Sequence, residues 1–550
     1  MEQRLLGREA LLAGGVAAVG AALLAWLGPP GTDLAAHVYQ RALFVDHGYS
    51  LWNNFWYAGH YTFVTYSLLY YPLAAVLGIR LLAVLSIAAA ALAFAALVER
   101  EWGTTPRWAS RTFALCWALF VLSGAYPFAL GTAFGLFAAL ALQSSSRRSF
   151  ILLAALTLAA SPLAFLLLVL LLVGVVVERR PNGRMLLAAG ITVGVLGAIE
   201  VVLWKLFPST GHYPFSFAEL AADIAFCLCG IGLTWRVEQA RPLRFVFPAY
   251  LVASLIAFFV PSGVGENIAR LRYAAFPLAV LTLSLRSWRP RVVALAALVL
   301  AGSWNLTPLA MSFVAARSDP AASPKYWTET IRYLKQNLTP SYRVEAVDTE
   351  NHWPAAYLAE AGIPLARGWY RQDDFPQNEL LYDAFGARAY LKWLRGLGVR
   401  YVVLTKAKPD YSARGESRLL LSGHSGLRTV HSTATVTIYA VPSPRPLVTG
   451  PGEARVLHLG RSWINMYLDK PGRYRVAVRW SPYWHTTAGC VTSGDDGMVR
   501  VVVARSEWLH LAFNVNATRA LSALSGASPT VCAPAPTGFV RLDSARHRGP

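Results

Sequence analysis

Residues 292–312 read VVALAALVLAGSWNLTPLAMS, an apolar run of the length, ~20 residues, that a helix needs to cross a bilayer. Beyond this run the composition changes, since 18 of the 30 acidic residues follow residue 312. The 550-residue chain is 55% hydrophobic and only 15% charged, which is too apolar for a water-soluble protein. We therefore predict a membrane domain in residues 1–312 and a water-soluble part after it.

Ten further apolar runs precede this one, so the sequence predicts eleven membrane spans in all. The first run continues into Gly28 and two prolines without a small-residue cleavage site, which indicates a retained span rather than a signal peptide. The short fifth run ends at residue 160, and the sixth begins with Pro162 directly after Ser161, which favours a tight helical hairpin there. The predicted spans are residues 10–27, 79–98, 108–124, 127–142, 149–160, 162–177, 185–206, 219–235, 244–260, 271–286 and 292–312.

The basic residues of the loops predict the orientation of these spans. Sixteen of them, including Arg4 and Arg180, fall on one side of the predicted membrane and five on the other. Basic loops are typical of the cytoplasmic face, so we expect a multi-pass protein of the cell membrane with a cytoplasmic N-terminus and extracytoplasmic C-terminal domains. The net charge of +20 then reflects loop orientation, and nucleic-acid binding is not expected.

Residues 28–78 are expected to form one long outer loop that lies on the membrane surface. Its second part, residues 61–78, is apolar but rich in tyrosine, and aromatic rings with a polar tip favour the headgroup region. We predict that this segment does not cross the bilayer, because a crossing here would invert every later span.

The soluble part divides into two predicted domains. Residues 313–441 mix helical patterns with strand-like runs, which predicts an extracytoplasmic α/β domain. Residues 442–550 carry short alternating runs separated by turns, which predicts an extracytoplasmic β-sandwich. Cys490 and Cys532 both lie in this last domain, where an oxidising exterior favours a disulfide between them; the alternative is two unrelated buried thiols.

Asp33 is the first candidate for chemistry. It follows the first predicted span in the stretch GTDLAAH (residues 31–37), and a helix that starts there puts Asp33 and His37 on one face. A carboxylate at the membrane boundary can act as a general base toward an acceptor hydroxyl. The alternative, compatible with the first, is an ordinary helix cap. Arg41 lies farther along the same loop and is predicted to bind substrate.

A second polar outer loop contains Glu266, Asn267, Arg270 and Arg272. The two arginines break the pattern of basic residues inside, and guanidinium groups bind phosphate through paired, planar hydrogen bonds. We therefore predict a phosphate-binding site formed by this loop. The alternatives are a Glu266–Arg270 pair along a helix, or binding of lipid headgroups.

Further candidates lie beside these two loops. Glu200 is predicted within a span, where a carboxylate usually faces a cavity or a partner such as an outer arginine, and the alternative is a structural buried pair. His212 and Tyr213 follow in the next outer loop and are expected to line the same mouth.

In the soluble part, Arg367, Trp369 and Arg371 combine aromatic and charged groups that suit a sugar, but they suit a domain interface equally, and we favour the interface. Trp484 has the same two interpretations. The sequence contains no nucleotide-type glycine loop, HExxH helix or GxSxG elbow, so soluble nucleotide chemistry is not indicated and a metal site is unknown.

This arrangement resembles the GT-C superfamily of membrane glycosyltransferases, in which a first span is followed by a long outer loop that begins with an acidic residue. The fold class expected on this basis is an α-helical polytopic membrane domain of about eleven spans, followed by the α/β domain and the β-sandwich. A narrower resemblance is to actinobacterial multi-pass proteins with a membrane domain named as related to 6-pyruvoyl-tetrahydropterin synthase. It is carried by DLAAH (residues 33–37), YYPL (70–73), GENIARL (265–271) and ARGW (366–369).

The superfamily resemblance implies an enzyme that moves a sugar from a polyprenyl-phosphate donor to an extracytoplasmic envelope glycan or lipid acceptor. Asp33 would be the base, and Arg270 and Arg272 would hold the leaving phosphate. Many relatives carry a second acidic residue in the next outer loop, where this chain has Tyr126 and Pro127, so metal dependence and the details of acceptor activation stay open. No cofactor requirement is predicted, and a divalent cation is an alternative. The competing functions are a transporter or flippase of lipid-linked envelope precursors and a non-catalytic envelope assembly protein.

Overall fold

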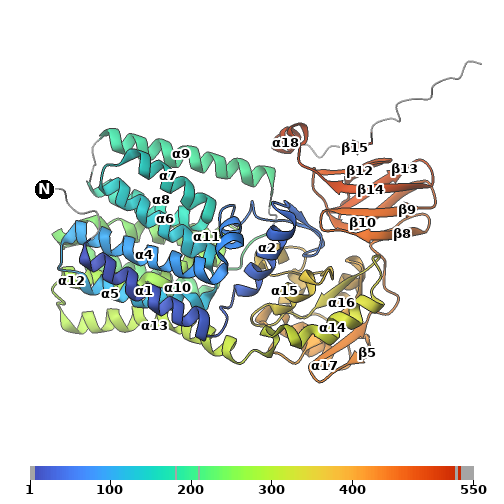
Figure 1. The fold of residues 1–550 in the computed structure, drawn as a ribbon, viewed down its shortest axis with the longest axis horizontal. Coiled ribbons are helices and arrows are strands. Elements are labelled where there is room, and N and C mark those ends of the chain that lie inside the picture. The colour runs from blue at the N-terminus through green and yellow to red at the C-terminus, as the bar shows by residue number, and fades with distance from the viewer. Residues whose placement is uncertain (1–6, 180–182, 209–210, 527–529, 534–550) are drawn as a thin grey trace, which may run out of the picture.

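The computed structural model describes residues 7–179, 183–208, 211–526 and 530–533. Arg4 and Arg180, counted above among the cytoplasmic residues, and residues 534–550 of the predicted β-sandwich lie outside these ranges. Helices dominate as far as α13 (Arg291–Arg317), and strands become frequent after residue 342 (Figure 1). The change of composition at residue 312 therefore falls in the last turns of the final long helix.

Among the described residues of the helical part, eight helical segments are long and apolar enough to cross a bilayer, which is consistent with a polytopic membrane protein. Three predicted spans fall short of this length or apolarity in their described residues: α5 (Arg107–Leu119), α7 (Arg147–Ala160) and α8 (Pro162–Arg179). The eight are α1 (Arg8–Leu27), α4 (Ile79–Trp102), α6 (Tyr126–Gln143), α9 (Gly183–Leu206), α10 (Phe217–Thr234), η2 with α11 (Glu238–Phe259), η3 with α12 (Gly265–Leu285), and α13.

The loop between α1 and α4 folds into α2 (Leu34–His47), a hairpin of β1 (Trp52–Asn53) and β2 (His60–Tyr61), and α3 (Tyr70–Leu77). The α3 helix has eight residues, far fewer than the ~20 that cross a bilayer, and no other helix lies in residues 61–78. Most tyrosine and tryptophan side chains of this loop are buried inside the protein, whereas the sequence predicts that they face the headgroup region. The loop is buried between the helical part and the strand-rich part (Figure 1).

Aromatic side chains fasten this loop to both C-terminal domains. The Trp56 indole is fully buried and donates a hydrogen bond of 2.9 Å to the Ala355 carbonyl. Tyr61 donates one of 2.9 Å to the Ser481 hydroxyl, and Trp52 stacks on Phe513 with ring centroids 5.1 Å apart. The reason for the tyrosine and tryptophan content of the loop is therefore a protein interface.

The first C-terminal domain is built on a four-stranded sheet of order β3-β4-β6-β5, in which only the β3–β4 pair is parallel. Helices and strands both occur in residues 313–441, as predicted. The elements are α14 (Pro324–Asn337), β3 (Arg343–Ala346), α15 (Trp353–Glu360), α16 (Ala387–Gly396), β4 (Val399–Thr405), α17 (Arg414–Leu421), β5 (Arg428–Ser432) and β6 (Val436–Ala440).

The last domain consists of two antiparallel sheets, of order β15-β12-β13-β10-β7 and β11-β14-β9-β8. Alternate side chains such as Ile464, Met466 and Leu511 are buried between them, as expected of a sandwich. The strands are β7 (Val448–Thr449), β8 (Ala454–Leu459), β9 (Trp463–Leu468), β10 (Gly472–Arg479), β11 (Trp484–Thr486), β12 (Cys490–Ser493), β13 (Met498–Val503), β14 (Glu507–Phe513) and β15 (Val531–Cys532).

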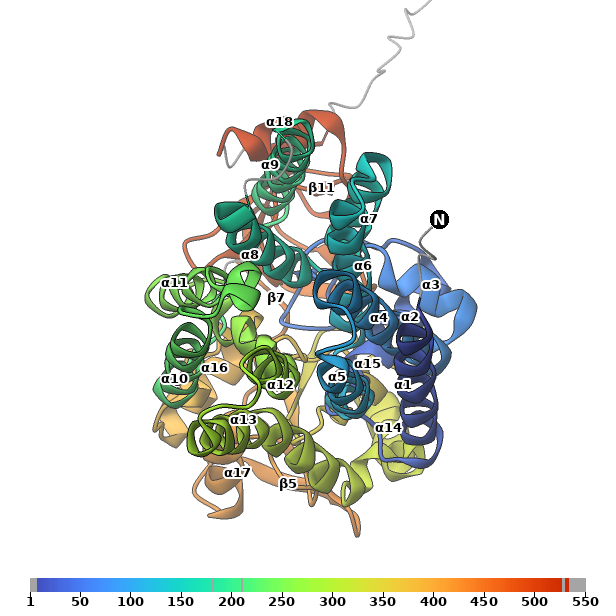
Figure 2. The ribbon, with the colours of Figure 1, turned by 90° about the vertical axis from the view of Figure 1, so that its left-hand side faces the viewer.

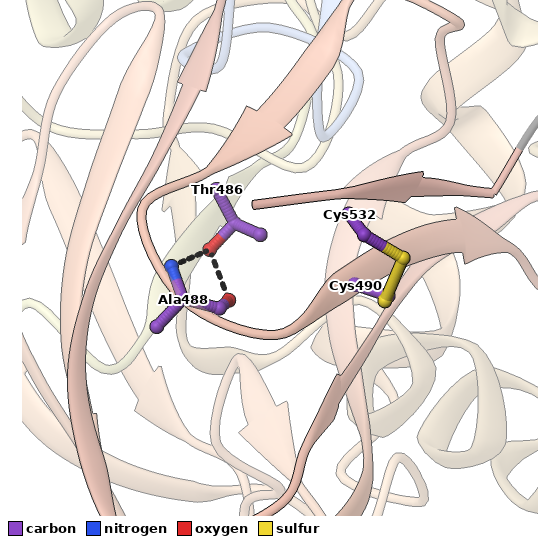
Figure 3. The surroundings of a disulfide bond; sticks show 4 residues. All are labelled: Thr486, Ala488, Cys490 and Cys532. Atoms are coloured by element: carbon purple, nitrogen blue, oxygen red, sulfur yellow. Dashed lines mark hydrogen bonds between the residues drawn. A yellow bond between two sulfur atoms is a disulfide. The ribbon is translucent and has the colours of Figure 1, made fainter. Parts of the chain in front are cut away.

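A disulfide joins Cys490 on β12 to Cys532 on β15 (Figure 3). It holds the last described strand to the sheet edge. The short helix before that strand, α18 (Ala517–Leu524), packs against the end of the apolar helix α9 (Figure 2). The sandwich therefore contacts the helical part as well as the outer loop.

We expect Trp56→Ala to destabilise the folded protein by about 3–5 kcal/mol, since a fully buried indole and its hydrogen bond to the first C-terminal domain are both lost. The matched control is Trp508→Ala, because that side chain is 60% exposed on the sandwich and should cost less than about 1 kcal/mol. Thermal unfolding of the purified protein in detergent measures both. An equal loss of stability in the two variants would contradict the anchoring role of Trp56.

Candidate functional site

Asp33 lies at the start of α2, directly after the first apolar helix. Its side chain makes no capping hydrogen bond with α2, so the alternative of an ordinary cap does not describe it. Instead its Oδ2 lies 3.7 Å from Nη2 of Arg270, and the two side chains keep 23% and 17% of their surface exposed. A carboxylate and a guanidinium that are 237 positions apart in the chain thus meet in a partly open site.

The backbone around Asp33 is held against the turn before α6. The Asp33 amide donates to the Ser123 carbonyl at 3.1 Å, and the Thr32 hydroxyl donates to the same carbonyl at 2.9 Å. Gly124 completes this turn with φ of +72°, and a Cβ there would lie 2.7 Å from the Asp33 nitrogen. Glycine is therefore required at this position for the close approach that fixes Asp33.

Arg270 comes from η3 (Gly265–Ala274), the turn before α12. Its Nε donates to Oδ1 of Asn267 at 3.3 Å, which orients the guanidinium. Glu266 accepts from the Ser216 amide at 3.1 Å, and the described residues show no Glu266–Arg270 ion pair. Asn267 and Glu266 therefore shape the loop, and the alternative in which Glu266 neutralises Arg270 is not what the structure contains.

Arg272 does not join this site, so the prediction that both arginines lie beside Asp33 is wrong. Its Nη1 forms an ion pair of 2.9 Å with Glu219, which also accepts from the Trp304 indole at 2.9 Å. The two arginines lie in a 3-10 helix, which has ~3 residues per turn, so that side chains two positions apart point about 120° away from each other. Only one of the two guanidiniums can face Asp33.

His37 and Tyr213 border the site, as expected. The His37 ring is buried, with Nδ1 3.2 Å from the Tyr71 hydroxyl, and burial together with the charge of Arg270 lowers its pKa to about 3. His37 is therefore neutral and cannot supply a charge. Tyr213 lies close enough to Asp33, Arg270 and Arg371 for their charges to act on its hydroxyl.

The first C-terminal domain completes the site. Burial raises the pKa of Asp33, while the positive charges of Arg270, His352 and Arg371 oppose this shift. Two of these three groups belong to the C-terminal domain, and α15, which starts after His352, packs on α2. Trp369 lies between the two halves, since its ring centroid is 6.2 Å from both His37 and His352. The positive charges that act on the Asp33 carboxylate thus come from both halves.

The sequence analysis did not select Asp348, His352 and Asp410. Asp348 Oδ2 lies 2.6 Å from Nδ1 of His352, and Asp410 binds the Arg371 guanidinium at 2.9 and 3.4 Å. Burial lowers the pKa of His352, but the charges of Asp348 and Asp410 outweigh this and leave it above the usual 6.5. The i, i+4 spacing of Asp348 and His352 was a signal in the sequence, but it did not indicate that their partners lie in other segments.

One oxygen or nitrogen from each of Asp348, His352 and Asp410 falls within 4.8 Å of the others, which is close enough for a shared metal ion. Their donor atoms are engaged differently, however. Both Asp410 oxygens face the Arg371 guanidinium, and Nδ1 of His352 faces Asp348. Because cationic side chains already neutralise the carboxylates, we interpret the cluster as an ion-pair network that orients His352 and Arg371.

Three predicted substrate-binding residues lie outside the site. Arg41 donates to the Ala74 carbonyl at 2.7 Å and so caps the end of α3. Glu200 on α9 has no ion pair among the described residues, so its expected arginine partner is not found. The His212 ring packs on Phe375 with centroids 4.4 Å apart, at the interface with the C-terminal domain.

Of the predicted glycan contacts, two lie in the site and two lie outside it. Trp369 and Arg371 belong to the site, but Arg367 is buried and forms a two-point ion pair with Asp374 at 3.1 and 2.7 Å. Trp484 is buried in the sandwich core and donates to the Arg479 carbonyl at 3.0 Å. These two side chains support the fold, and a glycan does not reach them.

Comparison with known proteins gives no family for this chain. It matches no protein-family model, and no curated protein matches it. The argument for a function therefore starts from the geometry and charge of the site.

We expect Arg367→Met to cost about 3–5 kcal/mol of stability, because it leaves the buried Asp374 carboxylate without its partner. The control is Lys408→Met, which breaks the Lys408–Glu350 ion pair. This pair is also 2.7 Å long, but the lysine side chain is 63% exposed, so its loss should cost less than about 1 kcal/mol. Thermal unfolding measures the stability of both variants. A wild-type melting temperature for the Arg367 variant, combined with lost glycan binding, would assign Arg367 to a sugar site instead.

Proposed function

We propose that this protein is a membrane glycosyltransferase of the GT-C type, which moves a sugar from a polyprenyl-phosphate donor to an envelope glycan or lipid acceptor. The observation that carries this proposal is the 3.7 Å approach of the Asp33 carboxylate to the Arg270 guanidinium, at the junction of the apolar helices and the strand-rich part. A base and an anion-binding group are the two functions that such a transfer needs at one place.

Asp33 is the proposed general base. The acceptor hydroxyl must lose its proton as its oxygen attacks the anomeric carbon of the sugar, and a carboxylate with a raised pKa accepts that proton more readily than an exposed one. The carboxylate is also available for this role, since it does not cap α2.

Arg270 is the proposed phosphate ligand. It lies in the turn before α12, so a lipid chain within the bilayer can bring its phosphate to the guanidinium without leaving the membrane. The donor phosphate has one negative charge, and the released phosphate carries a second. A fixed guanidinium favours this change because it interacts more strongly with the product-like charge.

In this proposal the site faces the extracytoplasmic side and the N-terminus is cytoplasmic. All eleven apolar runs then serve as spans, with the shorter α5, α7 and α8 crossing where the bilayer is locally thin. The excess of basic residues in the loops that would be cytoplasmic supports this orientation.

A transporter or flippase needs polar groups along a path across the membrane. Asp223, which is buried and accepts from Tyr250 at 3.4 Å, lies only one helical turn from Glu219, whose partner Arg272 is in η3. These groups therefore gather near the same end of the helices as Asp33, which favours a transferase over a transporter.

We expect Asp33→Asn to lower sugar transfer by about 10²–10⁴-fold, because the amide cannot take up the acceptor proton. Binding of the donor should stay within a few-fold of wild type, since Arg270 remains. The measurement is transfer from a panel of radiolabelled polyprenyl-phosphate sugars, with donor binding recorded in parallel.

The matched control is Asp46→Asn, because Asp46 is an exposed carboxylate on the same helix. It should leave transfer unchanged. Wild-type activity in the Asp33 variant would contradict its role as base, and failure of the wild-type protein with every donor would favour the transporter.

The activity should also depend on pH through Asp33. The carboxylate is the active form, so transfer falls as the pH falls through the Asp33 pKa, and burial places this loss above the usual value of 3.8. Arg270→Gln removes the largest opposing charge and should move the midpoint to still higher pH.

The pH dependence of kcat at saturating donor measures this midpoint. Arg272→Gln is the control, because its guanidinium pairs with Glu219 and should leave the midpoint in place. A midpoint that moves in the Arg272 variant but not in the Arg270 variant would refute the assignment of Asp33 and Arg270.

A further inference from the structure

His352 is the most unusual polar group beside the site. It lies at the start of α15 with φ of +59°, a left-handed conformation that is uncommon for a residue other than glycine. Asp348 holds its Nδ1 at 2.6 Å, and about 10% of the His352 side chain stays exposed. Among the described residues, Nε2 has no hydrogen-bond partner. One nitrogen of the ring is thus fixed and the other is available.

The surroundings of His352 connect it to Asp33. Its charge acts on the Asp33 carboxyl, and its ring meets the Trp369 ring edge to face. The Trp369 ring centroid is also 6.2 Å from that of His37, which lies one helical turn after Asp33. The charged groups that face His352 are Asp348, Asp410 and Arg371 on its own domain and Asp33 at the start of α2.

We propose that His352, oriented by Asp348, is a second catalytic residue and donates a hydrogen bond from Nε2 to the phosphate of the lipid carrier as it leaves. This inference rests on the proposed transferase function and extends it to the C-terminal domain. It also explains why that domain packs on α2, since the site lacks this donor without it.

The charges of the reaction explain why a second cation is needed. The acceptor oxygen bonds to the anomeric carbon, and its proton passes to Asp33. The bond from that carbon to the phosphate oxygen breaks, and its electron pair stays on the phosphate. The phosphate therefore changes from a diester with one negative charge to a monoester with a second one. Arg270 matches the first charge, and protonated His352 matches the second.

A purely structural role for the Asp348–His352 pair would predict something different. Such a pair would stabilise the turn before α15, and its loss would lower stability without affecting how phosphate binding depends on pH. The pKa of His352, raised above 6.5, instead predicts that protonated His352 contributes to phosphate binding at neutral pH and that this contribution is lost as the pH rises through that pKa.

The experiment measures binding of a short-chain polyprenyl monophosphate to the full-length protein in detergent, between pH 7 and 9. We expect wild-type affinity to fall by about tenfold over this range, and affinity of the His352→Gln variant to be low and independent of pH. Asp348→Asn should move the fall to lower pH, because the carboxylate that raises the pKa is gone. His424→Gln, an exposed histidine of the same domain, should behave as wild type.

Sugar transfer gives the second readout. His352→Gln should lower kcat by about 10²-fold and change the KM of the donor much less. If wild-type protein transfers sugar and the His352 variant keeps its rate and pH dependence, the inference about His352 is wrong and the transferase proposal stands. If wild-type protein transfers no sugar but its phosphate binding depends on His352, the transferase proposal fails and the phosphate contact stands.

Discussion

The burial of the outer loop between the helices and the two C-terminal domains is the constraint on which the site depends. Asp33 and His352 lie at the starts of helices α2 and α15, which are far apart in the chain. Their relative position is fixed because α2 packs on α15, because Trp56 of the same loop is buried at this contact, and because the Leu365 amide donates to the Phe55 carbonyl at 2.8 Å. The hydrophobic effect thus sets the geometry of the polar groups.

The charged groups in and around the site lie in pairs of opposite sign. Asp410 holds Arg371, Asp348 holds His352, and Asp33 faces Arg270. The first two pairs lie within one domain and orient their cations, whereas the third joins two loops of the membrane half and is longer, at 3.7 Å. In the proposed reaction this longer contact is the one that must open, because the donor phosphate needs Arg270 and the acceptor proton needs Asp33.

Local patterns in the sequence predicted most of the helices and strands, because apolar periodicity reports which face each element buries. They also selected Asp33 and Arg270, since a charged side chain near the end of a predicted span costs free energy and is therefore typical of a functional site. Patterns of this kind do not predict side-chain direction in an irregular turn, so Arg272 was wrongly placed beside Asp33. The sequence did not reveal the Asp348–His352 pair as a site component, because its neighbours come from distant segments.

The outer loop shows why the surroundings of an aromatic segment are hard to predict from sequence. A tyrosine- and tryptophan-rich segment suits the headgroup region and a protein interface equally well, since both offer an apolar side and a polar one. What distinguishes them is whether the polar atoms find fixed partners, as the Trp56 indole does at Ala355 and the Tyr61 hydroxyl does at Ser481. Fixed partners make the loop rigid. A rigid loop can fix the position of the Asp33 carboxylate to within a few tenths of an ångström, as proton transfer requires. A mobile loop on the lipid surface would not provide this precision.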